Sequence, residues 1–240
     1  MDIVIDLETV PDQRASALDE ILETLTVMVS SDLTKPKLMD ALGVTDKYKT
    51  VGELKDMWLE EFGAVKKTEQ AKEALHKTCF DGSKGEIASA SFQTIDSDQK
   101  YSFVRGQGES ESLLLENIWG KVNELCNSKP PFFIAHNADF DLPFLFHRSV
   151  IKRVKPNSYF KPHSRHGSDH YCTMKAWAGF KDRIGLDRLA KALGVEGKLK
   201  GMTGADVYQY WLDGRLAEIV TYCDQDVEVT KNIYKRINFL

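Results

Sequence analysis

The first clear hydrophobic pattern in the chain is the apolar run Ile3 to Leu7, which is rich in β-branched residues. It predicts a central strand, because such runs favour strands and Pro11 blocks simple continuation. Similar runs at Glu86 to Ile95 and Tyr101 to Arg105 predict a hairpin closed through a polar turn. A fourth strand is predicted at Pro131 to Ala135.

Apolar side chains at helical spacing predict helices between and after these strands. The predicted helices cover residues 14–29, 51–75, 109–126, 141–153, 186–193, 205–213 and 216–236. Gly194 and Gly214 follow two of them, as glycine commonly does at helix ends. The order of three strands, a helix, a strand and further helices predicts an α/β fold with a mixed sheet flanked by helices.

Composition narrows the class of protein. With 240 residues, of which 42% are hydrophobic, the chain can bury one main core. Its longest apolar runs fall far short of the roughly 20 residues that a membrane-spanning helix needs. No export signal is visible, so a cytoplasmic protein is expected. The four cysteines form no C-x-x-C pair, which argues against a disulfide framework and an all-cysteine zinc site.

The net charge of −4 provides no overall attraction for nucleic acid. The segment from Arg148 to Gly167 differs, because it carries several basic residues and no Asp or Glu. It could form a basic wall for phosphates, or it could be an ordinary solvated loop. Tyr159 and Phe160 lie within it, and they could stack on bases or simply pack in the core.

Asp6 and Glu8 lie two residues apart on a predicted strand, so both side chains point to one face of the sheet. Two carboxylates at the end of a buried strand repel each other and resist desolvation unless cations neutralise them. The pattern therefore indicates a metal site. Taken alone, it fits equally a strand end that reaches solvent.

Two further elements carry candidate chemistry. The apolar strand ending at Ala135 runs into a polar turn, and Asp141 falls in the first turn of the helix that follows. Strand ends of this kind often carry sites, although an acid there is also an ordinary helix cap. In the last helix, Tyr222 and Asp226 are four residues apart and share one face. Alone, that pair is typical of any helix surface.

Taken together, these motifs resemble the DEDD family of 3′-5′ exonucleases, whose order is a D-x-E strand, an N-x-x-F-D segment and a late Y-x-x-x-D helix. The resemblance covers nearly the whole chain. It is closest to the free-standing exonucleases related to the proofreading domains of family-B DNA polymerases. Residue 221 is Thr, where a histidine-type member would have His, so Tyr222 indicates the tyrosine (DEDDy) branch.

The resemblance implies a ribonuclease H-like fold with a mixed five-stranded sheet. It also implies a single exonuclease domain over residues 1–240. Two features depart from the family pattern. A helical insertion at about residues 30–85 has no counterpart in the minimal fold, and Cys172 stands where many relatives carry an aspartate.

The resemblance further implies a mechanism with two metal ions, Mg²⁺ or Mn²⁺, because hard oxygen ligands suit these cations. The implied ligands are Asp6, Glu8, Asp141 and Asp226. By family analogy Asp6 bridges the ions, Glu8 and Asp226 hold the ion that activates water, and Asp141 helps the second. Tyr222 is expected to orient the attacking water.

Single-stranded DNA is the expected substrate, with RNA as an alternative. The candidate substrate contacts are Thr9, Val10, His136, Asn137 and Phe140. The backbone of Thr9 and Val10 would meet the terminal 3′-hydroxyl, which would make a free end necessary. Asn137 would contact the terminal nucleotide, whereas core packing is the favoured role of Phe140.

Several alternatives remain open. An exoribonuclease would use the same acids, and nothing in the sequence clearly reads a 2′-hydroxyl. An inert module could hold nucleic-acid ends for a partner, although the intact acids speak against it. A nuclease of the integrase or resolvase type is disfavoured by the late Tyr-x-x-x-Asp helix. Replication or recombination proteins are candidate partners, and the pathway and oligomeric state are open.

A structural zinc site is a rival metal hypothesis. His163, His166, His170 and Cys172 lie close together in the sequence and are residue types that bind zinc. Their spacing matches no common zinc finger. The segment around Cys172 is instead typical of a buried strand or a helix start.

Overall fold

The computed structural model describes residues 1–163, 169–197 and 201–240. Its contacts divide the chain into two compact units. The first unit comprises Met1–Pro11 and Thr78–Leu240, and the second comprises Asp12–Lys77. The second unit therefore begins earlier than the insertion expected at about residues 30–85. The single-domain organisation stays a prediction.

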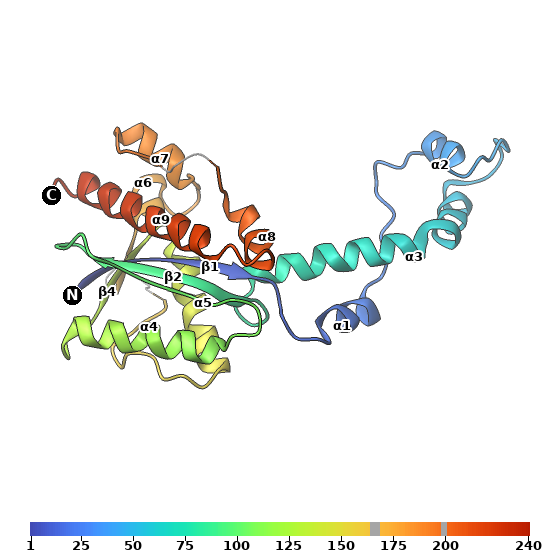
Figure 1. Cartoon of the computed structure of the whole chain (residues 1–240). Helices are drawn as coiled ribbons and strands as arrows, with labels where there is room; N and C mark the ends of the chain where they lie inside the picture. Colours follow the sequence, from blue (N-terminus) through green and yellow to red (C-terminus); the bar gives the residue numbers. More distant parts are fainter. Residues whose placement is uncertain (164–168, 198–200) are drawn as a thin grey trace. The chain divides into compact units, whose positions relative to one another are not determined.

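The first unit contains a five-stranded sheet with helices on both faces (Figure 1). In chain order its elements are β1 (Asp2–Val10), the 3₁₀ helix η1 (Thr78–Phe80), β2 (Glu86–Thr94), β3 (Lys100–Val104), α4 (Glu111–Cys126), β4 (Phe132–Ala135), α5 (Ala138–Ile151), β5 (His170–Cys172), α6 (Thr173–Ala178), α7 (Leu186–Leu193), the 3₁₀ helix η2 (Gly204–Asp206), α8 (Val207–Leu212) and α9 (Leu216–Ile237). The segment around Cys172, expected to be a buried strand or a helix start, is both, because β5 ends at Cys172 and α6 begins at Thr173.

The sheet is mixed, with strand order β3-β2-β1-β4-β5 among the described residues. Strand β1 is antiparallel to β2 and parallel to β4, and β5 continues the parallel half. The α/β fold with a mixed five-stranded sheet flanked by helices is therefore confirmed, and it is consistent with the ribonuclease H-like class. Within the described ranges, no helix is long and apolar enough to cross a membrane.

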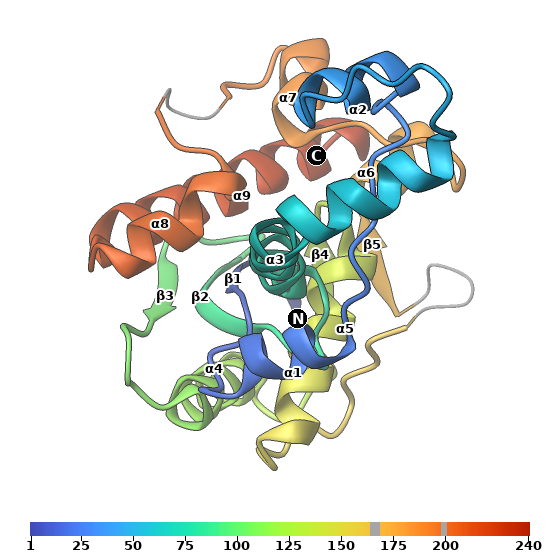
Figure 2. The same ribbon diagram turned by 90° about the vertical axis from the view of Figure 1, so that its right-hand side faces the viewer.

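Strand β1 lies in the middle of the sheet, and its alternation sorts side chains between two layers. Ile3, Ile5 and Leu7 join the core that contains α4 and α5. Val4 packs instead with Val227 of α9. Figure 2 shows α9 and α4 on opposite sides of the sheet. The even-numbered positions of β1 therefore face α9.

A buried ion-pair network joins β2, β3, α4 and α5. Arg148 lies 2.7 Å from Glu111 and 3.6 Å from Glu86, while Arg105 lies 2.6 Å from Glu86. Lys152 approaches both acids, at 3.3 and 3.4 Å. The expected basic wall was therefore wrong for Arg148 and Lys152. Their charges neutralise buried acids contributed by segments far away in the sequence.

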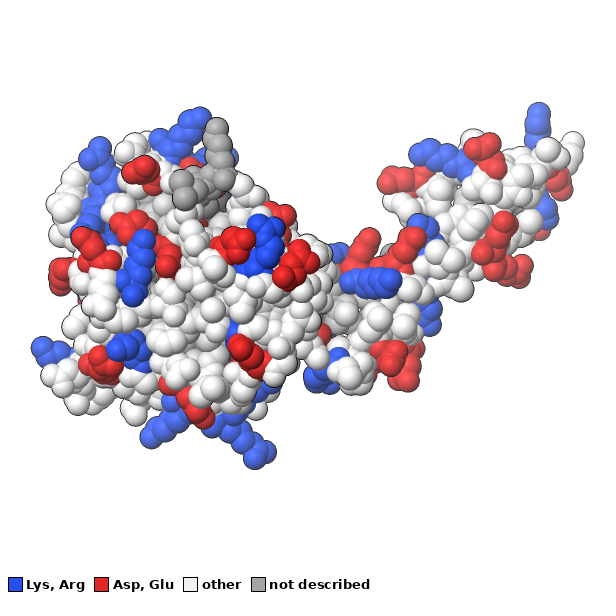
Figure 3. Space-filling view, in the orientation of Figure 1, with Lys and Arg blue, Asp and Glu red and all other residues white. Residues whose placement is uncertain are grey.

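Other residues of the basic segment, from Arg148 to Gly167, also make contacts within the protein. Lys161 lies 2.7 Å from Asp169. Phe160 packs against Trp119 and Phe133, with ring centroids 4.9 and 5.4 Å apart, so it belongs to the core. Arg165 and His166 lie outside the described residues. Figure 3 shows basic and acidic side chains interspersed on the face in view.

The second unit is helical. Its elements are α1 (Ala17–Thr24), α2 (Lys35–Ala41) and α3 (Val51–Lys77), of which the sequence patterns missed α2. Leu38, Leu54 and Trp58 form its own small core, and Phe62 packs against it. The rings of Trp58 and Phe62 lie 5.6 Å apart. These apolar side chains of α3 therefore pack within their own unit.

We expect Arg148→Met to reduce the free energy of unfolding by about 3–5 kcal/mol, because the charge of Glu111 would be left buried without its closest cation. The measurement is urea unfolding followed by circular dichroism. Arg215→Met is the control, since Arg215 pairs with Glu218 in solvent. It should change the free energy of unfolding far less, because ion pairs in solvent contribute little to stability. Equal effects of the two substitutions would contradict the role of the buried pair.

Candidate active site

Strand β1 and helix α9 bring two neighbouring acids together with a cysteine that is far away in the sequence. The candidate ligand atoms of Asp6, Glu8 and Cys223 all lie within 4.8 Å of one another. The Cys223 Sγ lies 3.4 Å from both the carbonyl oxygen and Oδ2 of Asp6. The face of β1 that carries the two acids thus meets the helix that carries Tyr222 and Asp226.

Asp141 reaches the same strand from α5. Its Oδ1 accepts a hydrogen bond of 3.2 Å from the backbone N–H of Leu7, the residue between Asp6 and Glu8. The helix begins after Asn137, which has a left-handed conformation (φ 66°) and turns the chain out of β4. Asp141 therefore contacts the central strand as well as lying in the first turn of a helix.

Burial and neighbouring charge disfavour ionisation of this carboxyl. Asp141 is only 4% exposed. Its pKa is raised from 3.8 to about 8: burial is the largest cause, the hydrogen bond from Leu7 opposes the shift, and the charge of Asp226 adds to it. Asp226 is also buried. The electrostatic coupling of Asp141 to Asp226 connects the acid of α5 with the acid of α9.

Cys223 is a neutral neighbour of the two acids on β1. Burial raises the pKa of its thiol well above the ordinary value, and the charges of Asp6 and Glu8 raise it further. The thiol therefore stays protonated beside the carboxylates. Its place in the cluster was not predicted from the sequence, although Cys223 lies three residues before Asp226, a spacing that places both on one helix face.

The donor set fits a divalent cation that prefers oxygen. Asp6 and Glu8 offer carboxylate oxygens at close range, and Asp141 contacts the strand between them. Clustered acids of this kind are stabilised by a bound cation, and Mg²⁺ and Mn²⁺ favour such ligands. Within the described ranges, His163, His170 and Cys172 form no comparable group, and His166 lies outside those ranges.

Tyr222 lies one turn before Asp226 and packs beside the end of β1. It joins Val10 and Trp211 in a buried cluster. Its hydroxyl lies 3.9 Å from the position that a Cβ on Gly204 would occupy. The segment that begins with Gly204 therefore lies at van der Waals distance from this hydroxyl.

The end of β1 is irregular where substrate contacts are predicted. The register with β2 shifts between Glu8 and Thr9, and such bulges often re-aim groups beside active sites. The Thr9 hydroxyl donates a 2.8 Å hydrogen bond to the carbonyl of Cys79 in η1. The side chain of Val10 is fully buried, so any substrate contact by this residue would come from its backbone.

His136, Asn137 and Phe140 follow β4. Both ring nitrogens of His136 are engaged, with the Thr173 hydroxyl at 2.8 Å and the Ile184 carbonyl at 2.9 Å. A substrate contact by His136 stays a prediction. Asn137 and Phe140 line an open cavity of about 450 Å³, whose other lining residues are Phe80, Asp139 and Arg183.

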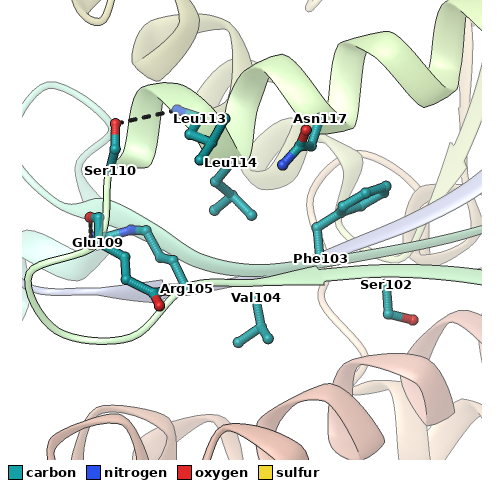
Figure 4. A pocket seen from close by; sticks show the side chains of 9 residues that line it. All are labelled: Ser102, Phe103, Val104, Arg105, Glu109, Ser110, Leu113, Leu114 and Asn117. Atoms are coloured by element: carbon teal, nitrogen blue, oxygen red, sulfur yellow. Dashed lines mark hydrogen bonds between the residues drawn. The ribbon is translucent and has the colours of Figure 1, made fainter.

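A second cavity, of about 480 Å³, lies between β3 and α4. Figure 4 shows Phe103 and Leu114 pointing into this space, whereas Ser102 and Val104 point to the other side of the strand. Its lining residues do not include Asp6, Glu8, Asp141 or Asp226. The cavity is therefore separate from the acidic cluster.

Comparison with known families gives one match. A family model described as "Predicted 3'-5' exonuclease related to the exonuclease domain of PolB" matches residues 85–240, which is more than half of the chain. The matched range contains Asp141, Tyr222 and Asp226 but not Asp6 and Glu8. No curated protein matches the chain.

The raised pKa of Asp141 predicts a pH-dependent stability in EDTA. Unfolded chains release this proton near the ordinary pKa of 3.8, whereas the folded protein retains it up to about 8. The folded state therefore binds more protons between these values, and stability should fall as the pH rises from about 5 to about 8. Asp141→Asn should show a smaller fall, measured by urea unfolding across this range. If the free energy of unfolding of wild type and of Asp141→Asn fell equally with pH, the raised pKa of Asp141 would be contradicted.

Proposed function

The chain belongs to the family of predicted 3′-5′ exonucleases related to the exonuclease domain of PolB, and we propose that it hydrolyses single-stranded DNA from the 3′ end with two metal ions. The observation that carries the proposal is the meeting of Asp6 and Glu8 with α9. Asp141 reaches the same strand through Leu7. Family membership supports nuclease activity, a nucleic-acid substrate and dependence on divalent metal.

Each acid has a proposed role. Asp6, Glu8, Asp141 and Asp226 would hold Mg²⁺ or Mn²⁺ through their carboxylate oxygens. Bound at such a site, the ions would lower the pKa of water and neutralise the phosphate. Glu8 and Asp226 are proposed to serve the side where water attacks, and Asp141 the side of the leaving 3′ oxygen.

Tyr222 is proposed to orient the attacking water through its hydroxyl. Support comes from its place on α9, one turn before Asp226. No shift in the pKa of the tyrosine is required if the metal has already acidified the water. This role assigns the enzyme to the DEDDy branch.

Recognition of a free end is proposed for the bulged end of β1. The register shift after Glu8 changes the direction of the backbone at Thr9 and Val10. Their backbone groups would contact the terminal 3′-hydroxyl, next to the acids on the same strand. Asn137 would contact the terminal nucleotide. A chain end, rather than an internal phosphate, would then be the reacting position.

We expect 5′-labelled single-stranded DNA to shorten stepwise from its 3′ end with Mg²⁺ or Mn²⁺ and to remain intact in EDTA. Asp6→Asn and Asp226→Asn should slow digestion by about 1,000-fold or more, because each removes a charged ligand. Asp224→Asn is the matched control on the same helix, since Asp224 accepts a hydrogen bond from Ser102 of β3. The measurement is the rate of ladder formation on a denaturing gel.

A 3′-phosphate on the substrate should block digestion if the free 3′-hydroxyl is recognised. Faster digestion of a matched RNA strand would replace DNA by RNA as the substrate. No cleavage of either strand with retained binding would refute catalysis and favour an end-binding module. Loss of activity in Asp224→Asn as large as in Asp226→Asn would contradict the assigned ligand set.

Tyr222→Phe should lower kcat by about 10-fold or more while leaving metal affinity unchanged, because only the orienting hydroxyl is removed. Digestion kinetics give kcat, and calorimetric titration with Mn²⁺ gives metal affinity. Tyr234→Phe is the control, since Tyr234 lies on the same helix with its ring 4.8 Å from that of Tyr171. A weakened Mn²⁺ affinity in Tyr222→Phe would instead indicate a structural role.

A further inference from the structure

Tyr48 is an aromatic side chain that the core of the second unit leaves in solvent. It lies in the loop at residues 43–50, between α2 and α3, and is 95% exposed. Apolar residues on both sides of it, Val44 and Leu54, pack into the core of that unit. A single exposed ring is common on protein surfaces, so its surroundings decide whether it has a role.

Hydrogen bonds hold the backbone of this loop in a defined conformation. The N–H of Tyr48 donates to Oδ1 of Asp46 at 2.9 Å. Where the loop enters α3, the N–H of Thr50 donates to the carboxylate of Glu53 at 2.7 Å, and the N–H of Glu53 donates to the Thr50 hydroxyl at 3.2 Å. The exposed ring is therefore presented by an ordered backbone, which reduces the entropy that a ligand would lose by ordering it.

Basic residues gather around Tyr48. Lys47 and Lys49 flank it in the chain, and residues 35–50 hold four lysines and two aspartates. The second unit as a whole has 13 acidic and 10 basic residues, so this positive excess is local. Within the part of the chain that the structure describes, no acid lies within ion-pair distance of Lys35, Lys47 or Lys49.

The structure also brings these lysines together in space. The Nζ of Lys35 donates to the carbonyl oxygen of Lys47 at 2.9 Å. Hydrogen bonds from Thr50 lower the pKa of Glu53, and the charges of Lys49 and Lys35 lower it further, so both lysines lie near this carboxylate. Glu53 offsets part of their charge, but it is already held by Thr50. The loop therefore keeps a positive surplus beside an exposed ring.

This combination suits single-stranded nucleic acid. An exposed aromatic ring can stack on a base, and ammonium groups attract phosphates. An acidic peptide would use the lysines alone and would leave the ring of Tyr48 without a partner. The family model matches residues 85–240, so it covers no residue of the second unit. A contact here would be an addition of this chain to the family's nuclease domain.

We propose that the loop at residues 43–50 is a second contact for single-stranded nucleic acid, in which Tyr48 stacks on a base and Lys35, Lys47 and Lys49 bind nearby phosphates. The proposal rests on the proposed exonuclease function, which makes nucleic acid the ligand. It adds a binding site outside the acidic cluster. Because every base has a π face, the contact requires no particular sequence. It raises affinity for the substrate and leaves the chemical step unchanged.

A duplex would use only part of this surface. Its bases are paired and stacked on one another, so they offer Tyr48 no free face, whereas the lysines can still approach the phosphates. Loss of the ring should therefore affect single strands alone. Loss of the lysines should affect single strands and duplexes.

The test is binding of labelled DNA to the full chain in EDTA, measured by fluorescence anisotropy over a range of salt concentrations. The ligands are a single strand, a strand of the same length with abasic sites throughout, and a blunt duplex. Met28→Ala is the control for Tyr48→Ala, because Met28 is a large apolar residue of the same unit and is 76% exposed.

Tyr48→Ala should weaken binding of the single strand by about 10-fold and leave binding of the abasic strand and the duplex unchanged. Tyr48→Trp should retain the affinity, since it preserves a stacking surface. In digestion with Mg²⁺, Tyr48→Ala should raise KM by a similar factor and leave kcat unchanged, because the acids of the proposed site are intact.

The double substitution of Lys47→Gln and Lys49→Gln should weaken binding of all three ligands. For the single strand it should reduce the slope of log affinity against log salt by about 1.4, because two phosphate contacts are lost. The matched control is Lys66→Gln with Lys67→Gln, which removes the same charge from α3. The control should leave the affinity and the slope nearly unchanged.

Wild-type affinity of Tyr48→Ala for the single strand would overturn the proposal, as would an equal loss in Met28→Ala. Competition by polyglutamate as effective as that by a single strand would assign the surface to an acidic protein instead. Circular dichroism checks that each variant keeps its fold.

The outcome is separable from that of the proposed function, because the affinities are measured without catalysis. A protein that binds DNA through this loop but digests nothing would refute the exonuclease assignment alone. Digestion by a protein whose affinity is insensitive to the loop substitutions would refute the second contact alone.

Discussion

Carboxylates that leave water and stand beside one another repel, and the first unit must hold Asp6, Asp141 and Asp226 together against that repulsion. It does so by placing them on three elements that packing brings to one end of the sheet. The central strand faces α9 with one side and packs against α5 with the other. Burial, together with the charge of Asp226, raises the pKa of Asp141. The neutral thiol of Cys223 lies in the cluster without adding charge.

Contacts far from the acids keep these elements in position. The ion pair of Arg148 with Glu111 joins the last turns of α5 to the start of α4. On the other face, the buried Lys231 of α9 donates to the carbonyl of Ser97 at 2.7 Å and so ties the helix to the β2–β3 hairpin. Each contact satisfies a buried charge and also fixes the helix that carries an acid.

Thr9 connects the strand of the acids to η1. It follows Glu8 on β1, and its hydroxyl donates a hydrogen bond to the carbonyl of Cys79 in η1. Phe80, the last residue of η1, is exposed to solvent. The end of β1 and the exposed end of η1 are therefore held together through one side chain.

The spacing of residues along the sequence was enough to predict strands β1 to β4 and the longer helices. It also predicted that Asp6 shares a face with Glu8, and Tyr222 with Asp226, because these pairs depend only on the geometry of one strand or one helix. The short helix α2 was missed, and the segment of β5 and α6 was left open between a strand and a helix start, because a few residues show too little periodicity. Only the tertiary structure decided that Asp141 reaches Leu7, that Cys223 joins Asp6, and that Arg148 is buried against Glu111. These pairs join segments far apart in the chain, so they depend on how whole elements pack, and no local pattern encodes that.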